Sequence, residues 1–198
     1  MTIKLPVPVL AGKMTVEQAI HARRSVRSYS DSVLPVAALS QLLWAAQGIT
    51  GSGGMRAVPS AGGLYPLELY CVAGAVDGLP AGVYRYAMFG HELIPVVEGE
   101  SRESLAAAAL GQKCVRNGAA SIIIAAVFDR ATGKYSRRGI QYASMEAGHA
   151  AQNIYLQAVA LGLGTVAIGA FQDDRVKYAA RMRENETPLY IMPVGAVQ

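Results

Sequence analysis

The residues best suited to chemistry lie close to the amino terminus, in the stretch RRSVR. Arg23, Arg24 and Arg27 fall within five positions, in a chain of which only 16% of the residues are charged. Guanidinium groups bind phosphate and carboxylate through paired, directed hydrogen bonds. Arg23 and the hydroxyl of Ser25 could together hold a phosphate. Arg27, two residues further along an extended segment, would point to the same side as Ser25 and reach further along the ligand. The alternative without a ligand is a charged, solvated helix end.

A second basic cluster occupies residues 130–145, which contain Arg130, Lys134, Arg137 and Arg138 and no acidic residue. The net charge of the whole chain is +4. A nucleic-acid surface would show a longer basic stripe interleaved with aromatic side chains. Two short clusters favour a small anionic ligand instead, and we expect no nucleic-acid partner.

The elements that must position these residues follow from turn signals and hydrophobic periodicity. Thr15 and Gln18 form a capping box, which predicts a helix that ends near Arg24 and is followed by an extended segment. The glycine-rich residues 48–63 predict a long loop, and residues 132–139 a basic loop. Further helices are predicted at 35–47, 101–112, 141–161 and 173–183, and strands at 67–75, 82–88, 92–99, 120–128 and 188–196, with 164–171 a strand or turn. Because helices and strands mix without a strict βαβ rhythm, we predict an α+β fold in which residues 1–198 form one domain.

Two motifs match known sites only in part. The segment GLGTVAIG, residues 162–169, has the wrong glycine spacing for a dinucleotide loop and follows a helix, so we do not expect a Rossmann site. Glu146 and His149 have the spacing of half a di-iron site, but no second Glu-x-x-His occurs in the chain. We therefore expect no metal, and a satisfied interior histidine at His149.

The amino-acid composition bears on the oligomeric state and the cellular compartment of the protein. Hydrophobic residues make up 52% and the mean hydropathy is +0.26, which predicts that apolar surface is buried between subunits. Residues 147–172 carry no charge, but their glycines and polar side chains argue against a membrane helix. Cys71 and Cys114 are isolated and fit neither a disulfide framework nor a zinc site. Together with the lack of a signal peptide, this predicts a reducing compartment and a cytoplasmic protein.

Four segments give the chain a family resemblance: RRSVRSYS, AVPSAGGLYPLELYCVA, KYSRRGIQYASMEAGHAAQNIYLQAVALGLGTVAIGAFQDDRV and PLYIMPVG. In this order, over residues 15–195, they resemble the FMN-dependent nitroreductase family and, within it, the SagB-type dehydrogenases. That branch includes oxidases that convert peptide thiazolines and oxazolines to azoles. The resemblance implies a nitroreductase-like fold, with a mostly antiparallel central sheet flanked by helices. It also implies a domain-sharing homodimer with two FMN sites at the subunit interface.

Carried over by position, the resemblance implies roles for the amino-terminal residues and for a second, basic segment. Arg23 and Ser25 would meet the flavin phosphate, Arg24 would contribute mainly through its backbone, and Arg27 would lie near N1 and O2 of the ring. Lys134 and Tyr135 match a Lys-Tyr pair linked to catalysis in the azoline oxidases.

Two further flavin-binding segments follow from the resemblance. Pro59, Ser60, Ala61, Gly62 and Gly63 would come from the other subunit, where glycines let the backbone approach the flavin closely. Ala167, Ile168, Gly169 and Ala170 would lie along the ring edge, with a backbone N–H near Gly169 facing N5.

Two departures from the family pattern bear on function. Other members often have an acidic residue at the position of Gly169, and a basic residue soon after PVG, where this chain ends in GAVQ. The leading hypothesis is an oxidoreductase that transfers hydride from NAD(P)H through FMN to a small organic acceptor. One alternative is an azoline dehydrogenase that uses oxygen, with Lys134 and Tyr135 as base and acid. Another, suggested by the two departures, is a flavin-binding or sensory module without turnover.

Overall fold

The computed structural model describes residues 2–198, and within them seven strands form one sheet. The order of the strands across the sheet is β1-β4-β3-β2-β5-β7-β6, and all neighbouring pairs are antiparallel. The strands are β1 (Ile3–Lys4), β2 (Leu67–Ala73), β3 (Gly82–Ala87), β4 (Glu92–Glu98), β5 (Ala120–Ala126), β6 (Leu163–Thr165) and β7 (Thr187–Ala196). The predicted α+β class with a mostly antiparallel sheet is confirmed.

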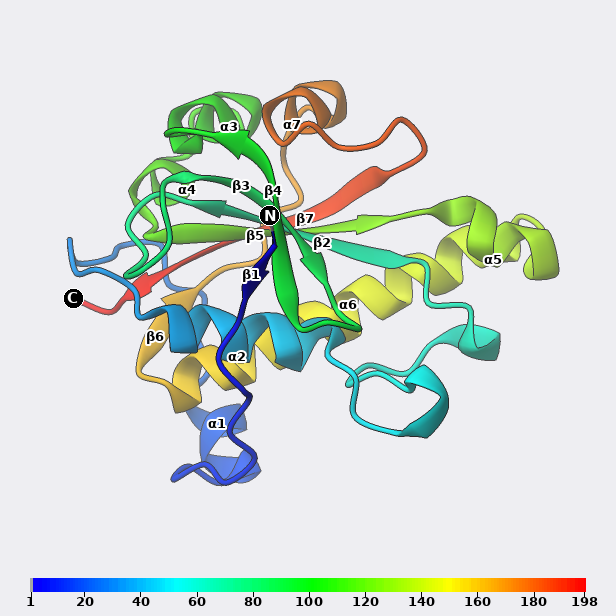
Figure 1. The fold of residues 1–198 in the computed structure, drawn as a ribbon, viewed down its shortest axis with the longest axis horizontal. Coiled ribbons are helices and arrows are strands. Elements are labelled where there is room, and N and C mark those ends of the chain that lie inside the picture. Colours follow the sequence, from blue (N-terminus) through cyan, green and yellow to red (C-terminus); the bar gives the residue numbers. More distant parts are fainter. Residues whose placement is uncertain (1) are drawn as a thin grey trace.

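Helices cover both faces of this sheet (Figure 1). Seen edge-on, α3, α4 and α7 lie on one side, and α1, α2 and α6 lie on the other. The helices are α1 (Val16–Ala22), α2 (Val36–Gln47), α3 (Arg102–Ala108), α4 (Lys113–Asn117), α5 (Phe128–Tyr135), α6 (Arg138–Ala160) and α7 (Asp173–Ala179), with two short 3₁₀ turns, η1 (Ser52–Gly54) and η2 (Ala61–Gly63).

Side chains alternate between the two faces of the central strands, and helices cover both faces, so these strands are buried on both sides. In β2, Leu67, Leu69 and Cys71 join the core beneath α2 and α6, whereas Tyr70 and Val72 join the core beneath α3 and α7. All seven residues of β2 and all seven of β5 are buried. β5 therefore appears as a nearly continuous apolar run in the sequence, whereas β2 includes the buried Glu68.

Helix α6 is the longest element and the one on which the candidate site is built. Its buried stripe is mostly alanine, including Ala143, Ala147, Ala150 and Ala158, and such small side chains let the helix approach its neighbours closely. Among residues 2–198, no helix is long and apolar enough to cross a membrane. The uncharged residues 147–172 are divided between the second half of α6, β6 and the turn that follows.

Three predicted boundaries were wrong for physical reasons. Residues 132–139 are not a loop: α5 extends to Tyr135 and ends where Ser136 adopts a φ of 49°. Its sequence is polar, but α5 packs so tightly against the start of α6 that a Cβ on Gly139 would lie 2.6 Å from the backbone of Ala131. The helix predicted at 101–112 ends at Ala108, because Leu110 is left-handed and the Gly111 N–H caps the Ala106 carbonyl at 2.8 Å. The helix predicted at 173–183 ends at Ala179, where the Ala180 N–H bonds to the Val176 carbonyl. Residues 164–171, predicted as a strand or turn, are a strand as far as Thr165.

Candidate functional site

The arginine segment leaves α1 as an extended chain along the edge of the sheet. The capping box of Thr15 and Gln18 is present, and α1 ends at Ala22, two residues before the predicted end. Ser25 then pairs in parallel with Thr165 of β6, and the Val26 N–H donates to the Thr165 carbonyl at 2.9 Å. The predicted extended exit is confirmed, and it lies directly beside the strand that leads into residues 167–170.

A tyrosine that the sequence reasoning missed joins these two segments. The hydroxyl of Tyr155 lies 2.9 Å from the Ser25 hydroxyl and accepts the Ala167 N–H at 2.8 Å. The Arg23 guanidinium lies over the same ring, 5.0 Å from its centroid. Because the Tyr155 oxygen accepts from Ala167, its single hydrogen can be donated to Ser25, which leaves the Ser25 hydrogen free for another acceptor. A tyrosine on the inner face of an alanine-rich helix needs a polar partner for its hydroxyl. This requirement is the feature of the sequence that could have drawn attention to Tyr155.

The three arginines of the segment have different surroundings. Arg24 turns back onto its own helix end, where Nη1 donates to the carbonyls of His21 and Arg23 at 3.0 and 2.7 Å. Arg23 and Arg27 form no salt bridge with a carboxylate of residues 2–198. Their charges are therefore available to a ligand, whereas the side chain of Arg24 is occupied.

Residues 167–170 run from the core to the surface beside this segment. Ile168 is buried and exchanges two backbone hydrogen bonds with Ile191, at 2.9 and 3.0 Å, which fixes the chain before Gly169. Gly169 itself is exposed, and a Cβ built on it would meet no atom closer than a ring carbon of Tyr190 at 3.9 Å. Protein packing therefore does not require a glycine there, and an acidic side chain would fit.

The glycines of residues 162–169 do not form a nucleotide loop. A dinucleotide loop connects a strand to the start of a helix. Here Leu163–Thr165 follows α6 and pairs with β7 as an edge strand of the sheet. The structure therefore agrees with the expectation that this stretch is not a Rossmann site.

The second predicted flavin segment, residues 59–63, is anchored by a buried carboxylate. Oε1 of Glu146 accepts hydrogen bonds from the Ser60 hydroxyl and the Ala61 N–H, both at 2.9 Å, and the Ser60 hydroxyl in turn accepts the Tyr65 N–H at 2.8 Å. Glu146 is 5% exposed, and its burial raises the pKa of the carboxyl above the ordinary value. The sequence reasoning missed this role.

The metal interpretation of Glu146 and His149 gains no support from the geometry. Glu146 is engaged by the loop, and His149 is exposed at the surface, so the expectation of an interior histidine was wrong. The two residues are three positions apart on α6 and therefore lie on neighbouring parts of the helix surface, but only Glu146 is buried. Within residues 2–198, no group of three or more His, Cys, Asp and Glu side chains could hold a metal ion.

Lys134 and Tyr135 lie directly against this anchored loop, on the last turn of α5. A Cβ on Gly62 would be 2.6 Å from the Tyr135 hydroxyl and 3.0 Å from Lys134 Nζ, and the φ of Gly62 is +64°. The positive φ favours glycine here, whereas the two side-chain ends could move aside for a Cβ. Tyr135 is held by Tyr142 in an edge-to-face contact, with ring centroids 5.1 Å apart. The structure thus brings together residues 60–62 and the predicted catalytic pair.

The two groups do not meet within one chain. Tyr155 and Glu146 are both on α6, nine residues apart, which corresponds to about 13 Å along the helix axis. In Figure 1, α1 and β6 lie at one end of α6, and α5 lies at the other. We name them the arginine group (Arg23, Ser25, Arg27, Tyr155 and residues 165–170) and the glycine-loop group (residues 59–63, Lys134, Tyr135 and Glu146).

A cavity of about 400 Å³ opens beside Tyr155 and Thr165. Arg24 is the one charged residue in its lining, and Arg23, Ser25 and Arg27 do not line it. The Thr165 hydroxyl is buried and has no hydrogen-bond partner in the described part of the chain. Buried hydroxyls normally have a partner, and an unpaired one next to a cavity calls for a ligand atom or a water molecule. The Thr165 hydroxyl therefore gives this cavity a polar group that a ligand atom can contact.

Comparison with known proteins identifies the family of the chain. The family model described as "Nitroreductase family" matches residues 20–196. The chain belongs to the nitroreductase family. It is 41% identical over 194 residues to a protein of Methanocaldococcus jannaschii named as a putative nitroreductase, covering 98% of this chain and 96% of that protein.

Two further relatives are longer than this chain. A crystal structure of a nitroreductase-like protein from Anabaena variabilis is 30% identical, with a TM-score of 0.88; the match covers 100% of this chain and 42% of that one. The microcin B17-processing protein McbC of Escherichia coli is 29% identical over 149 residues, which is 72% of this chain and 54% of McbC. The resemblance to the nitroreductase family is thus confirmed, with a more distant similarity to a SagB-type dehydrogenase.

Proposed function

We propose that this protein is an FMN-dependent oxidoreductase that takes hydride from NAD(P)H and passes it to a small organic acceptor. The observation that carries the proposal is the Tyr155 hydroxyl, which joins Ser25 and Ala167 and so links the segment expected at the flavin phosphate to the segment expected along the ring edge. Nitroreductase-family proteins typically bind FMN, and the family is named for a reduction reaction.

The residues of the arginine group suit an FMN molecule. Arg23 has no carboxylate partner in residues 2–198, and Ser25 retains a hydroxyl hydrogen, so both can meet a phosphate. The Thr165 hydroxyl supplies a further buried polar atom without a partner. Gly169 leaves open space where a planar ring could approach the backbone. Arg24, whose side chain is bonded to the end of α1, would serve through its backbone.

Bound FMN would supply the hydride chemistry, and the protein would supply position and charge. Arg23 and Ser25 would hold the phosphate. Arg27 would place a fixed positive charge near N1 and O2 of the ring, where reduction adds negative charge. A backbone N–H near Gly169 would face N5, and since Gly169 carries no side chain, the backbone alone would act there.

A homodimer is part of this proposal, because the arginine group and the glycine-loop group lie at opposite ends of α6. If both contact one flavin, residues 59–63 must come from the partner subunit. Exposed apolar side chains also favour a covered surface: on the amino-terminal arm Val7 is 86% and Leu10 81% exposed, and on α6 Met145 is 52% exposed. Light scattering coupled to size exclusion should give twice the 20.8 kDa chain mass.

The absorbance spectrum tests the function directly. Protein incubated with FMN and desalted should remain yellow, and NADH or NADPH should bleach it under anaerobic conditions. Arg23→Gln should lose most of the bound FMN, while the neighbouring Arg24→Gln, a matched control, should retain it. Failure of the wild-type protein to bind FMN would refute the proposal. Bound FMN that neither nucleotide reduces would instead favour the flavin-binding module without turnover.

Azoline dehydrogenation is a second candidate, supported by one observation. The Tyr135 hydroxyl and Lys134 Nζ both point at Gly62, so a base and an acid would meet at the same loop. McbC, a distant relative, is named as a microcin B17-processing protein. Under this candidate Lys134→Ala should abolish azole formation from a thiazoline peptide while FMN stays bound. Unchanged oxidation would exclude a catalytic Lys134.

A further inference from the structure

A second cavity, of about 490 Å³, lies at the end of the β3–β4 hairpin, beside the chain that follows residues 59–63. Three arginines line it, Arg56, Arg85 and Arg130, together with one carboxylate, Glu68. The remaining lining is apolar or aromatic and consists of Leu64, Tyr65, Tyr86, Ala87, Met88 and Phe89. Its volume is in the range of small-molecule sites, and its lining carries more positive than negative charge.

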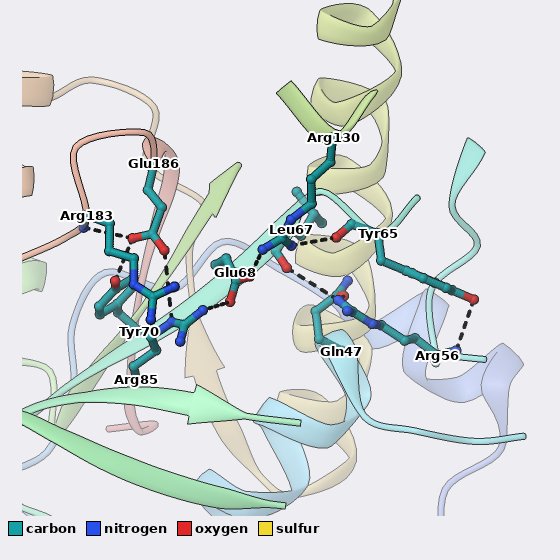
Figure 2. A network of polar contacts seen from close by, with 10 residues as sticks. All are labelled: Gln47, Arg56, Tyr65, Leu67, Glu68, Tyr70, Arg85, Arg130, Arg183 and Glu186. Atoms are coloured by element: carbon teal, nitrogen blue, oxygen red, sulfur yellow. Dashed lines mark hydrogen bonds and ion pairs between the residues drawn. The ribbon is translucent and has the colours of Figure 1, made fainter. Parts of the chain in front are cut away.

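Glu68 is fully engaged by two of the arginines (Figure 2). Its Oε2 accepts from Arg85 Nη2 at 2.7 Å, and its Oε1 accepts from Arg130 Nη2 at 2.6 Å, while the residue is 3% exposed. Behind it, Glu186 is completely buried and lies 3.9 Å from Arg85 Nε. The two carboxylates therefore balance Arg85 and Arg130.

Arg56 remains without a carboxylate partner in residues 2–198. Its Nη1 donates to Gln47 Oε1 at 2.7 Å and to the Leu67 carbonyl at 3.3 Å, both neutral acceptors, and its buried Nε has none. The guanidinium lies 4.5 Å from the centroid of the Tyr65 ring, which orients it. Burial lowers the pKa of Arg56, but an arginine stays charged in proteins. A half-buried charge of this kind is costly unless an anion compensates it.

We propose that this cavity binds an organic oxyanion, a carboxylate or phosphate carried on an aromatic or apolar body, with Arg56 as its main charged contact. The charge count favours an anion, and Tyr65 and Phe89 provide surface for a ring. The cavity is separate from the arginine group of its own chain, because Arg130 belongs to α5 at the opposite end of α6, and it adjoins the glycine-loop group, whose Ser60 is bonded to Tyr65. The proposal does not depend on the redox function.

Calorimetric titration with benzoate, phenyl phosphate and the neutral benzamide tests it, with excess FMN present to occupy any flavin site. At least one anion should bind one-to-one and at least tenfold more tightly than benzamide. The anion that binds with the lower dissociation constant identifies the preferred group, carboxylate or phosphate. Arg56→Gln should weaken binding at least tenfold. Arg181→Gln is the matched control, because Arg181 also lies over a tyrosine, Tyr178, at 5.1 Å, but lies outside the cavity.

A second pair of variants covers the case in which Arg56→Gln fails to fold. Phe89 lines the cavity and is 77% exposed, so replacing it should leave the fold intact. Phe89→Glu should weaken anion binding about fivefold, and Phe89→Lys should strengthen it by a similar factor. The proposal is overturned if neither anion binds, if benzamide binds as tightly as the anions, or if the two Phe89 variants have equal affinities. Binding that disappears when FMN is added would also overturn it, since the anions would then occupy the flavin site.

Discussion

Replacing Tyr155 with phenylalanine should weaken FMN binding and lower stability, because one hydroxyl joins two segments of the candidate site. The change removes the contacts to Ser25 at 2.9 Å and to the Ala167 N–H at 2.8 Å. It keeps the ring over which Arg23 lies. Each hydrogen bond contributes about 1 kcal/mol, and leaving the partly buried Ala167 N–H without an acceptor adds to the loss. We expect a total of about 2 kcal/mol.

For a chain of this length, that loss corresponds to a fall in Tm of roughly 4–8 °C, measurable by circular dichroism without FMN. The dissociation constant of FMN, from quenching of flavin fluorescence, should rise about tenfold, because Ser25 is no longer oriented. Tyr84→Phe is the matched control. Its hydroxyl donates to the Pro80 carbonyl at 2.7 Å and contacts neither Ser25 nor Ala167. This variant should lose about 1 kcal/mol of stability and keep its FMN affinity.

The two variants separate a local effect from a general one. Normal FMN affinity in Tyr155→Phe would refute the role given to the hydroxyl. An equal loss of affinity in Tyr84→Phe would show that reduced stability alone weakens binding. Only a loss confined to Tyr155→Phe agrees with the reasoning.

Three further predictions concern single residues. Because burial raises the pKa of Glu146, ionisation of this carboxyl opposes folding, so the stability of the protein is highest below the unfolded pKa and falls as pH rises through the folded pKa. Glu146→Gln should remove this fall, because the Gln carbonyl can still accept both loop hydrogen bonds. Thermal melts at pH 5 and pH 8 would contradict the prediction if wild type and variant lost the same stability. Gly62→Ala should cost about 1 kcal/mol in urea unfolding, since its φ is +64°, whereas Gly169→Ala, where φ is not positive and a Cβ has open space, should cost nothing measurable. Equal losses would contradict the role given to the left-handed backbone at Gly62. Burial raises the pKa of Cys71 to about 12, so a thiol reagent at pH 8 should react with it only after unfolding, and rapid reaction of the native protein would contradict the buried position.

Local signals in the sequence were sufficient for most of the elements. The capping box at Thr15, the hairpin of β3 and β4 and the apolar run of β5 each depend on residues close together in the chain, and each is present. The end of α3 was misplaced because its cap uses a left-handed leucine, Leu110, where glycine is the usual residue.

The residues that assemble the candidate site were beyond the reach of local signals. Ser25 and Tyr155 are 130 positions apart, and Ser60 and Glu146 are 86 apart. No periodicity or spacing can pair residues at such separations, because only the folded sheet brings them together. For the same reason, Lys134 was expected on a loop, although contact with α6 holds it on a helix. The segments could be named from a resemblance, but the side chains that hold them required coordinates.

The length of α6 between Glu146 and Tyr155 has a consequence for a dimer of the proposed kind. In such a dimer each α6 would anchor the glycine loop of one flavin site with Glu146, and the arginine segment of the other with Tyr155. The helix is continuous between them and carries Gly148 at its surface and a buried alanine stripe beneath. A tilt of one α6 would therefore displace opposite walls of both sites in a single motion. In such a dimer, FMN binding at one site would therefore change the affinity of the other site for FMN, and α6 would transmit the change.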